Sequence, residues 1–195
     1  MRTSAAVLGP FLVALLGLVA GAGCRAAEPS SAPAAGACPD AWAAAPHVDP
    51  SLVPPHGGVL LHGSATGTQS YACTAAADGG ARWTFTGPRA ELRDCHGELV
   101  ARHFASDAGA APEWQAPDGA YVIATKAAAL TPDGGAGAVP WLLLGARDHG
   151  GEGPLARTAY VQRVGTDGGV APAGGCTPGA TRDVPYGADY YFYGP

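Results

Sequence analysis

Asp-Gly dipeptides recur along the chain from residue 78 onward, each between apolar or aromatic segments. They occur at residues 78–79, 118–119, 133–134 and 167–168, and three of them continue as Asp-Gly-Gly. Such pairs form tight turns because glycine adopts the positive φ angles that these turns require. These turns indicate that the chain consists mainly of short elements.

The segments between the turns have the character of strands. They are short, evenly spaced and rich in β-branched or aromatic residues, and none has a sustained 3.6-residue period. The expected strands cover residues 58–62, 68–74, 82–85, 90–94, 98–104, 120–126, 138–144 and 158–164, with at most a helical turn near 41–45. With 30 glycines, 18 prolines and 47% hydrophobic residues, the sequence predicts an all-β fold, a single antiparallel β-sandwich or barrel-like domain with long loops and little helix.

Four aromatic residues in a row close the chain at positions 190–193, within Asp-Tyr-Tyr-Phe-Tyr. In a strand, Tyr190 and Phe192 would face one side while Tyr191 and Tyr193 face the other. Such a strand is either buried on both faces or carries one core face and one ligand-stacking face. We favour a core strand, because aromatic rings supply large buried area.

The N-terminus has the pattern of a bacterial export signal. Arg2 precedes an apolar run over residues 7–20, and small residues then lead to Cys24. The run is too short for a comfortable membrane span. We therefore expect a signal peptide over residues 1–23.

Two modes of cleavage are open. Gly-Ala-Gly-Cys at residues 21–24 resembles a lipobox with Gly21 in place of the usual Leu, whereas Ala-Gly-Ala at 20–22 suits ordinary signal peptidase. We favour a lipidated Cys24 followed by a flexible tether to residue 37, with the β domain over 38–195. This predicts an exported cell-envelope protein, an outer-membrane lipoprotein by its Arg25 and otherwise periplasmic or secreted, which contacts membrane only through its lipid anchor.

Four cysteines remain in the expected domain. An even number in an exported chain predicts two disulfides, and sequence cannot separate the three possible connectivities. We expect Cys73 to pair with Cys95 on a nearby strand, and Cys38 with Cys176. Because the cysteines show no Cys-x-x-Cys spacing, a zinc ribbon or a thioredoxin-type site is not indicated.

Charge and motifs exclude several functions. The net charge is −5 and the few cations are scattered, which argues against a nucleic-acid partner. Nucleotide-binding glycine motifs are missing, and His-Gly-Ser-Ala-Thr-Gly at 62–67 is not the nucleophile motif of serine hydrolases. The sequence therefore predicts no cofactor and no metal site.

The six histidines do not define a catalytic or metal-binding site by their spacing. His103, Asp118 and Lys126 could converge in a cleft, but no spacing defines a ligand triad. We expect the histidines to lie in loops or on the surface, and Asp118, in Pro-Asp-Gly, to be a turn residue.

A series of motifs runs through the expected domain, namely Gly-Thr-Gln-Ser-Tyr-Ala-Cys at 67–73 and the segments 83–94, 97–104, 112–122, 139–144, 160–172 and 184–193. In this order, and over about residues 52–193, they resemble the bacterial and fungal family known as domain of unknown function 3455. The chain departs from the family where Phe104 replaces Tyr and residues 105–111 lengthen the loop before Trp114. The resemblance implies no established activity.

The resemblance does imply where a site would lie. The positions are Gln69, Trp83, His103, Trp114, Asp118, Lys126, Trp141, Gln162, Arg163 and Tyr186. Trp141 is expected to anchor the core, and Gln162 and Arg163 must point to opposite sides of their strand.

Two functions from different classes remain. The first is a non-catalytic envelope module that binds a small molecule, glycan or partner protein, with His103, Trp114, Asp118, Lys126, Arg163 and Tyr186 as candidate ligand-binding residues. The second is a hydrolase or metal-dependent enzyme that uses His103 and Asp118. We favour binding, because the sequence shows aromatic surface and no coherent catalytic constellation.

Overall fold

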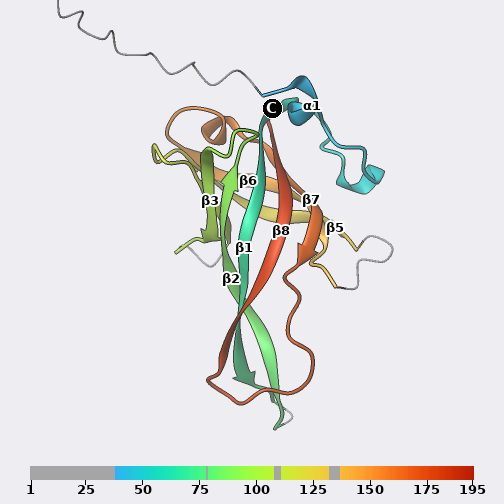
Figure 1. The fold of residues 1–195 in the computed structure, drawn as a ribbon, viewed down its shortest axis with the longest axis vertical. Coiled ribbons are helices and arrows are strands. Elements are labelled where there is room, and N and C mark those ends of the chain that lie inside the picture. Colours follow the sequence, from blue (N-terminus) through green and yellow to red (C-terminus); the bar gives the residue numbers. More distant parts are fainter. Residues whose placement is uncertain (1–37, 78, 108–110, 132–136) are drawn as a thin grey trace, which may run out of the picture. The chain divides into compact units, whose positions relative to one another are not determined.

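The computed structural model describes residues 38–77, 79–107, 111–131 and 137–195, which belong to one compact unit (Figure 1). Its elements are a short helix and two 3₁₀ turns, α1 (Asp40–Ala43), η1 (Pro50–Leu52) and η2 (Leu155–Arg157), and eight strands, β1 (Val59–Ala75), β2 (Ala81–Arg93), β3 (Leu99–Ala105), β4 (Pro112–Gln115), β5 (Tyr121–Leu130), β6 (Trp141–Gly150), β7 (Tyr160–Gly168) and β8 (Thr181–Tyr193). The expected signal peptide, Cys24 and tether lie outside the described residues.

The eight strands form one sheet that closes on itself. Each strand pairs antiparallel with the next along the chain, and β8 pairs with both β7 and β1. The predicted all-β, antiparallel fold is therefore confirmed, as a barrel. Within the described residues, no helix is long and apolar enough to cross a membrane.

Two strands are longer than expected because their internal glycines do not form turns. The expected segments 58–62 and 68–74 merge into β1, where a side chain at Gly67 would clash with the carbonyl of Arg89 on β2. The segments 82–85 and 90–94 merge into β2, where Gly87 has φ 150° beside a bulge opposite Ser70 and Tyr71. β4 was not expected as a separate strand.

The Asp-Gly pairs form turns at some positions but not at all. Gly119, at φ 91°, donates to Ala116 O between β4 and β5, while Asp118 Oδ1 accepts from the Ala120 amide. Gly79, at φ 82°, lies in the β1–β2 turn. The pair at 167–168 belongs to the end of β7, where Asp167 still pairs with β8. The stretch 133–135 is outside the described residues.

The closing aromatic residues form a strand that is buried on both faces, as predicted. Tyr190 and Phe192 are 1% and 0% exposed and belong to the barrel interior. Tyr191 and Tyr193 lie on the outer face, where Tyr191 stacks on His62 at 4.0 Å between ring centroids. Trp42 packs against His62 in a tilted geometry, with ring centroids 4.2 Å apart, so the N-terminal segment covers these rings.

Within the part of the chain that the structure describes, two disulfides are present, as expected, but both predicted pairings are wrong. The bonds join Cys38 to Cys95 and Cys73 to Cys176. Cys73 lies opposite Trp83 in the β1–β2 ladder, whereas Cys95 follows the far end of β2, beyond the pair Ser64–Arg93. Nine residues of strand correspond to roughly 30 Å, and the Cα atoms of a disulfide lie within about 7 Å of each other. The expected bond is therefore excluded by the length of β1. Its internal glycines suggest two short strands, so the sequence does not indicate this length.

We predict that non-reducing peptide mapping will recover Cys38–Cys95 and Cys73–Cys176 peptides. Replacing Cys73 and Cys176 together by serine should lower the free energy of unfolding by about 2–4 kcal/mol in urea titrations, because the bond closes a long loop in the unfolded chain. The matched Cys38→Ser/Cys95→Ser variant, with a shorter loop, should lose slightly less. A peptide that links Cys73 to Cys95 would contradict this structure.

Candidate functional site

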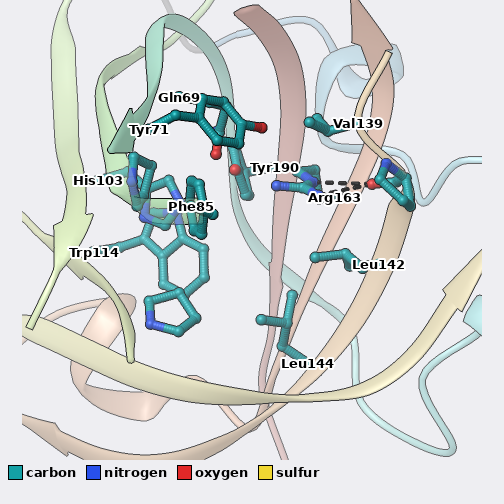
Figure 2. Close-up of a pocket in the computed structure, with 13 residues that line it drawn as sticks. Gln69, Tyr71, Phe85, His103, Trp114, Val139, Leu142, Leu144, Arg163 and Tyr190 are labelled. Carbon is teal, nitrogen blue, oxygen red and sulfur yellow. Dashed lines mark hydrogen bonds between the residues drawn. The ribbon is translucent and has the colours of Figure 1, made fainter. Parts of the chain in front are cut away.

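The barrel interior holds a cavity of about 220 Å³. Its wall comes from seven of the strands and adjoining segments, and consists of Gln69, Tyr71, Phe85, Pro88, His103, Pro112, Trp114, Val139, Pro140, Leu142, Leu144, Arg163 and Tyr190 (Figure 2). Most of this wall is apolar or aromatic, with a few polar side chains. Phe85 is half-exposed, so it connects the cavity wall to the surface.

Strand register brings the two sides of the cavity together. Leu142, Arg163 and Tyr190 lie directly opposite one another across β6, β7 and β8. His103 and Trp114 are paired across β3 and β4, so the lengthened loop between them does not separate them. Figure 2 shows His103 and Trp114 on one side and Arg163 and Leu142 on the other.

Aromatic stacking makes one wall rigid. The His103 and Trp114 rings are parallel, with centroids 4.3 Å apart, and Tyr190 packs edge-on against both. Trp114 also meets Phe192 edge-on at 5.9 Å. Offset and edge-to-face pairs of this kind contribute beyond their buried area, so these rings hold fixed positions.

His103 is a neutral imidazole that keeps one nitrogen as a hydrogen-bond acceptor. Its Nδ1–H donates to Glu113 O at 2.9 Å, which leaves Nε2 with a lone pair. Complete burial lowers the pKa of the imidazole to about 3; the hydrogen bond to Glu113 opposes this shift, and the Arg163 charge adds to it. At neutral pH the ring therefore carries no charge.

Two buried N–H donors in this wall have no partner. Gln69 Nε2 and Trp114 Nε1 have no partner with hydrogen-bond geometry among the described residues, although their residues are only 2% and 1% exposed. The Gln69 side chain lies close enough to the Tyr186 hydroxyl to oppose the rise in the pKa of that phenol, so the Trp114 N–H is the clearer case. A buried donor without a partner costs about 1–3 kcal/mol. Unpaired groups of this kind are rare in folded proteins, so two in one small cavity call for an explanation.

Arg163 supplies the positive charge of the cavity. Its Nε and Nη2 both donate to Pro140 O, at 3.1 and 2.8 Å, as Figure 2 shows. The residue is 9% exposed, and no carboxylate of the described residues lies within ion-pair distance. A buried charge normally has a counter-charge, so this arginine is unusual.

Tyrosine hydroxyls complete the polar groups near the cavity. Tyr186 and Tyr190 share a hydrogen bond between their hydroxyls, 3.2 Å apart, and Tyr71 donates to Gly169 O at 2.6 Å. Burial raises the pKa of Tyr71 and that of Tyr186 above the ordinary value, and the Arg163 charge opposes both shifts. Both phenols are therefore neutral, and neither supplies the counter-charge that Arg163 lacks.

The structure brings together some of the residues singled out from sequence. His103, Trp114 and Arg163 line the cavity, and Tyr186 lies behind Tyr190. Asp118 and Lys126 are exposed and do not line it. The convergence of His103 with Asp118 and Lys126, on which an enzymatic site would depend, does not occur in this cavity.

Other positions from the sequence have different roles. Gln69 lines the cavity, whereas Gln162 faces the outer side of β7, where it donates to Leu52 O and accepts from the Tyr193 hydroxyl. Trp141 packs with the outer cluster of Tyr191 and Tyr193. The expectation that the histidines lie in loops or on the surface is wrong for His62 and His103, which are both buried inside strands.

A serine, a histidine and an aspartate also meet on the outer face, but not as a catalytic triad. Ser64 Oγ donates to Asp189 Oδ1 at 2.6 Å, and His62 Nε2 lies 3.1 Å from the same oxygen. The hydrogen bond from His62 lowers the pKa of Asp189. Because the serine contacts the carboxylate and not the imidazole, it lacks the base that a nucleophile needs. His62 Nδ1 donates to Trp42 O, so the cluster fastens the N-terminal segment to the barrel.

Among the described residues, one group of three possible metal ligands lies close together, Cys38, Cys95 and His96. Its two sulfur atoms form a disulfide. Since thiolates, and not disulfide sulfurs, bind metals well, this group does not form a metal centre.

Sequence reasoning missed several cavity residues. Tyr71 stands two positions after Gln69, so strand alternation could have placed both on one face. Tyr190 was assigned to the core alone. Val139, Pro140, Leu142 and Leu144 carried no signal, because apolar strand residues look the same in a filled interior and in a cavity wall.

We predict that His103 makes the protein less stable in acid. Its pKa is near 6.5 unfolded and about 3 folded, so the unfolded chain binds the extra proton and stability falls as pH drops from about 6.5 towards 3. His103→Asn keeps a donor for Glu113 O and should reduce this slope by up to about 1.4 kcal/mol per pH unit in urea titrations. The exposed His149→Asn is the control and should keep the full slope. An unchanged slope in the His103 variant would contradict the burial of a neutral imidazole.

Comparison with known proteins supports the resemblance seen in the sequence. Residues 54–194 match the family described as protein of unknown function (DUF3455). No curated protein and no solved structure matches the chain. The matched stretch runs from the segment before β1 to the end of β8, and so includes every strand of the barrel. The chain therefore belongs to the DUF3455 family.

Proposed function

We propose that this protein is a non-catalytic binding module that holds a small molecule inside its barrel. The observation that carries the proposal is the pair of unpartnered donors, Gln69 Nε2 and Trp114 Nε1, in the wall of one cavity. A ligand with polar atoms would satisfy both groups, and the free energy that they cost in the empty protein would then favour binding.

The dimensions of the barrel suit this role. Eight-stranded barrels have an interior that side chains just fill or that leaves room for one small ligand. A volume of about 220 Å³ corresponds to roughly seven water molecules at their share of the liquid. A small molecule fits such a space, whereas a glycan chain or a partner protein needs an open groove or surface. Of the three ligand classes considered from sequence, we therefore propose the small molecule.

The wall combines features that ligand sites share. Its apolar side chains, Leu142, Leu144 and Val139, face the stacked rings of His103 and Trp114. A few fixed polar groups among apolar surface give orientation and specificity. No nucleophile paired with a base is present among the described wall residues, and for this reason we propose binding without catalysis.

We further propose that the domain works in the cell envelope, exported by its signal peptide and held by a lipid on Cys24. The two disulfides are consistent with an extracellular or periplasmic protein, since such bonds persist in oxidising compartments. The tether between Cys24 and the domain would keep the barrel near the membrane while leaving it free to meet its ligand.

Anchoring can be tested directly. Cys24→Ser should move the full-length protein from the membrane fraction to the soluble fraction of an expressing bacterium, because the lipid is lost. The wild-type protein should need detergent for release. If the wild-type protein is found in the soluble fraction without detergent, the lipid anchor is contradicted. Ordinary signal cleavage would then be the alternative.

Binding can be tested with three ring compounds of similar size, benzoate, benzamide and benzylamine. We predict that at least one shifts the Trp114 indole N–H signal in NMR spectra, assigned with a Trp114→Phe variant. At about ten times its dissociation constant, that compound should raise the free energy of unfolding by about 1.4 kcal/mol.

Two matched variants test whether the compound binds in this cavity. Gln69→Leu removes an unpaired donor inside the cavity, so it should weaken binding at least severalfold while leaving the empty protein as stable or more stable. Ser106→Ala removes an unpaired buried hydroxyl that does not line the cavity, and should not change binding. If none of the three compounds affects the Trp114 signal or stability, the proposed function is wrong.

A further inference from the structure

The charge of the cavity narrows the class of ligand. Arg163 is buried, and two of its five N–H groups donate to the single oxygen of Pro140. A carbonyl carries no net charge, so it orients the guanidinium without neutralising it. Among the described residues no carboxylate pairs with Arg163. Its remaining N–H groups and its positive charge are available to a ligand.

The neighbours of Arg163 cannot supply the missing negative charge. The titratable groups that face it from other strands are His103 on β3, Tyr71 on β1, and Tyr186 and Tyr190 on β8. An imidazole that carries no proton on Nε2 is neutral, and burial raises the pKa of the Tyr71 and Tyr186 phenols, which holds both in their protonated form. The cavity therefore has a net charge of +1 before anything binds.

The rest of the wall selects an organic anion over a bare inorganic one. Leu142 and Leu144 lie on the side of Arg163, and the Trp114 and His103 rings lie across from it (Figure 2). An inorganic ion would leave this apolar surface uncovered, whereas a ring or short chain would cover it. A guanidinium fork also matches the two oxygens of a carboxylate in a bidentate geometry.

We propose that the cavity binds a small monocarboxylate with an apolar body, whose carboxylate pairs with Arg163. The apolar body then packs between Leu144 and the Trp114 ring. Further polar atoms of the ligand accept from Gln69 Nε2 and Trp114 Nε1 or donate to His103 Nε2. This inference rests on the proposed small-molecule function and specifies the ligand class for the same site.

Benzoate and benzamide test this inference, because they have the same ring and nearly the same size but differ in charge. Calorimetric titration of the wild-type protein at pH 7 should give a dissociation constant for benzoate at least about tenfold lower than for benzamide. Arg163→Met keeps a long apolar side chain and should abolish that preference while retaining benzamide binding. Arg163→Lys keeps the charge without the fork and should retain part of the preference.

Arg102→Met is the matched control. Arg102 lies on β3 with its side chain 57% exposed, outside the cavity wall, so its loss lowers the net charge equally but should leave the benzoate preference unchanged. This comparison separates the local charge of Arg163 from the field of the whole protein.

Three outcomes would overturn the inference. Equal affinities of the wild-type protein for benzoate and benzamide would do so, even if Arg163→Met fails to fold. Persistence of the preference in Arg163→Met would do so as well, and so would its loss in Arg102→Met. In each of these cases the binding of benzamide still supports the proposed function. If neither compound binds, the proposed function fails together with the inference.

Discussion

The pairing of β8 with β1 closes the barrel and so creates the interior in which the site lies. It extends from Val59–Tyr193 to Ala72–Thr181 and joins the last strand of the chain to the first. Without it the sheet would have two open edges, and Tyr190 and Phe192 would have no interior to fill. Closure fixes the diameter of the barrel, and the diameter fixes how much space the side chains must occupy.

The interior is filled unevenly, and this unevenness creates the site. Large apolar and aromatic side chains, such as Leu92, Val122 and Phe192, pack the part of the barrel away from the cavity. Elsewhere the wall contains Gln69 and Arg163, whose polar ends the protein itself only partly satisfies. A protein selected for stability alone would replace these side chains by apolar ones of similar volume. Their presence in the core is the physical reason to infer a ligand.

Local sequence patterns predicted which face of its strand a side chain occupies, because side chains alternate between the two faces along one strand. They placed Tyr190 and Phe192 on one face and Tyr191 and Tyr193 on the other, and they separated Gln162 from Arg163. They could not predict which residues of neighbouring strands lie opposite one another, because this depends on the register of the sheet. The register of the closed sheet determines that Arg163 aligns with Leu142 and Tyr190, and it also determines the distance between Cys73 and Cys95. Gly67 suggests a turn from sequence alone, whereas in the structure it allows a close contact between β1 and β2.

Arg163, Gln69 and Trp114 together give the cavity wall one positive charge and two N–H groups without a hydrogen-bond partner among the described residues. A crystal structure of the mature protein, refined with its ordered solvent, tests this most directly. We expect density for water, an anion or a bound molecule within hydrogen-bond distance of Gln69 Nε2, Trp114 Nε1 and Arg163. A collapsed cavity in which both donors bond to protein atoms and Arg163 pairs with a carboxylate of the chain would contradict it.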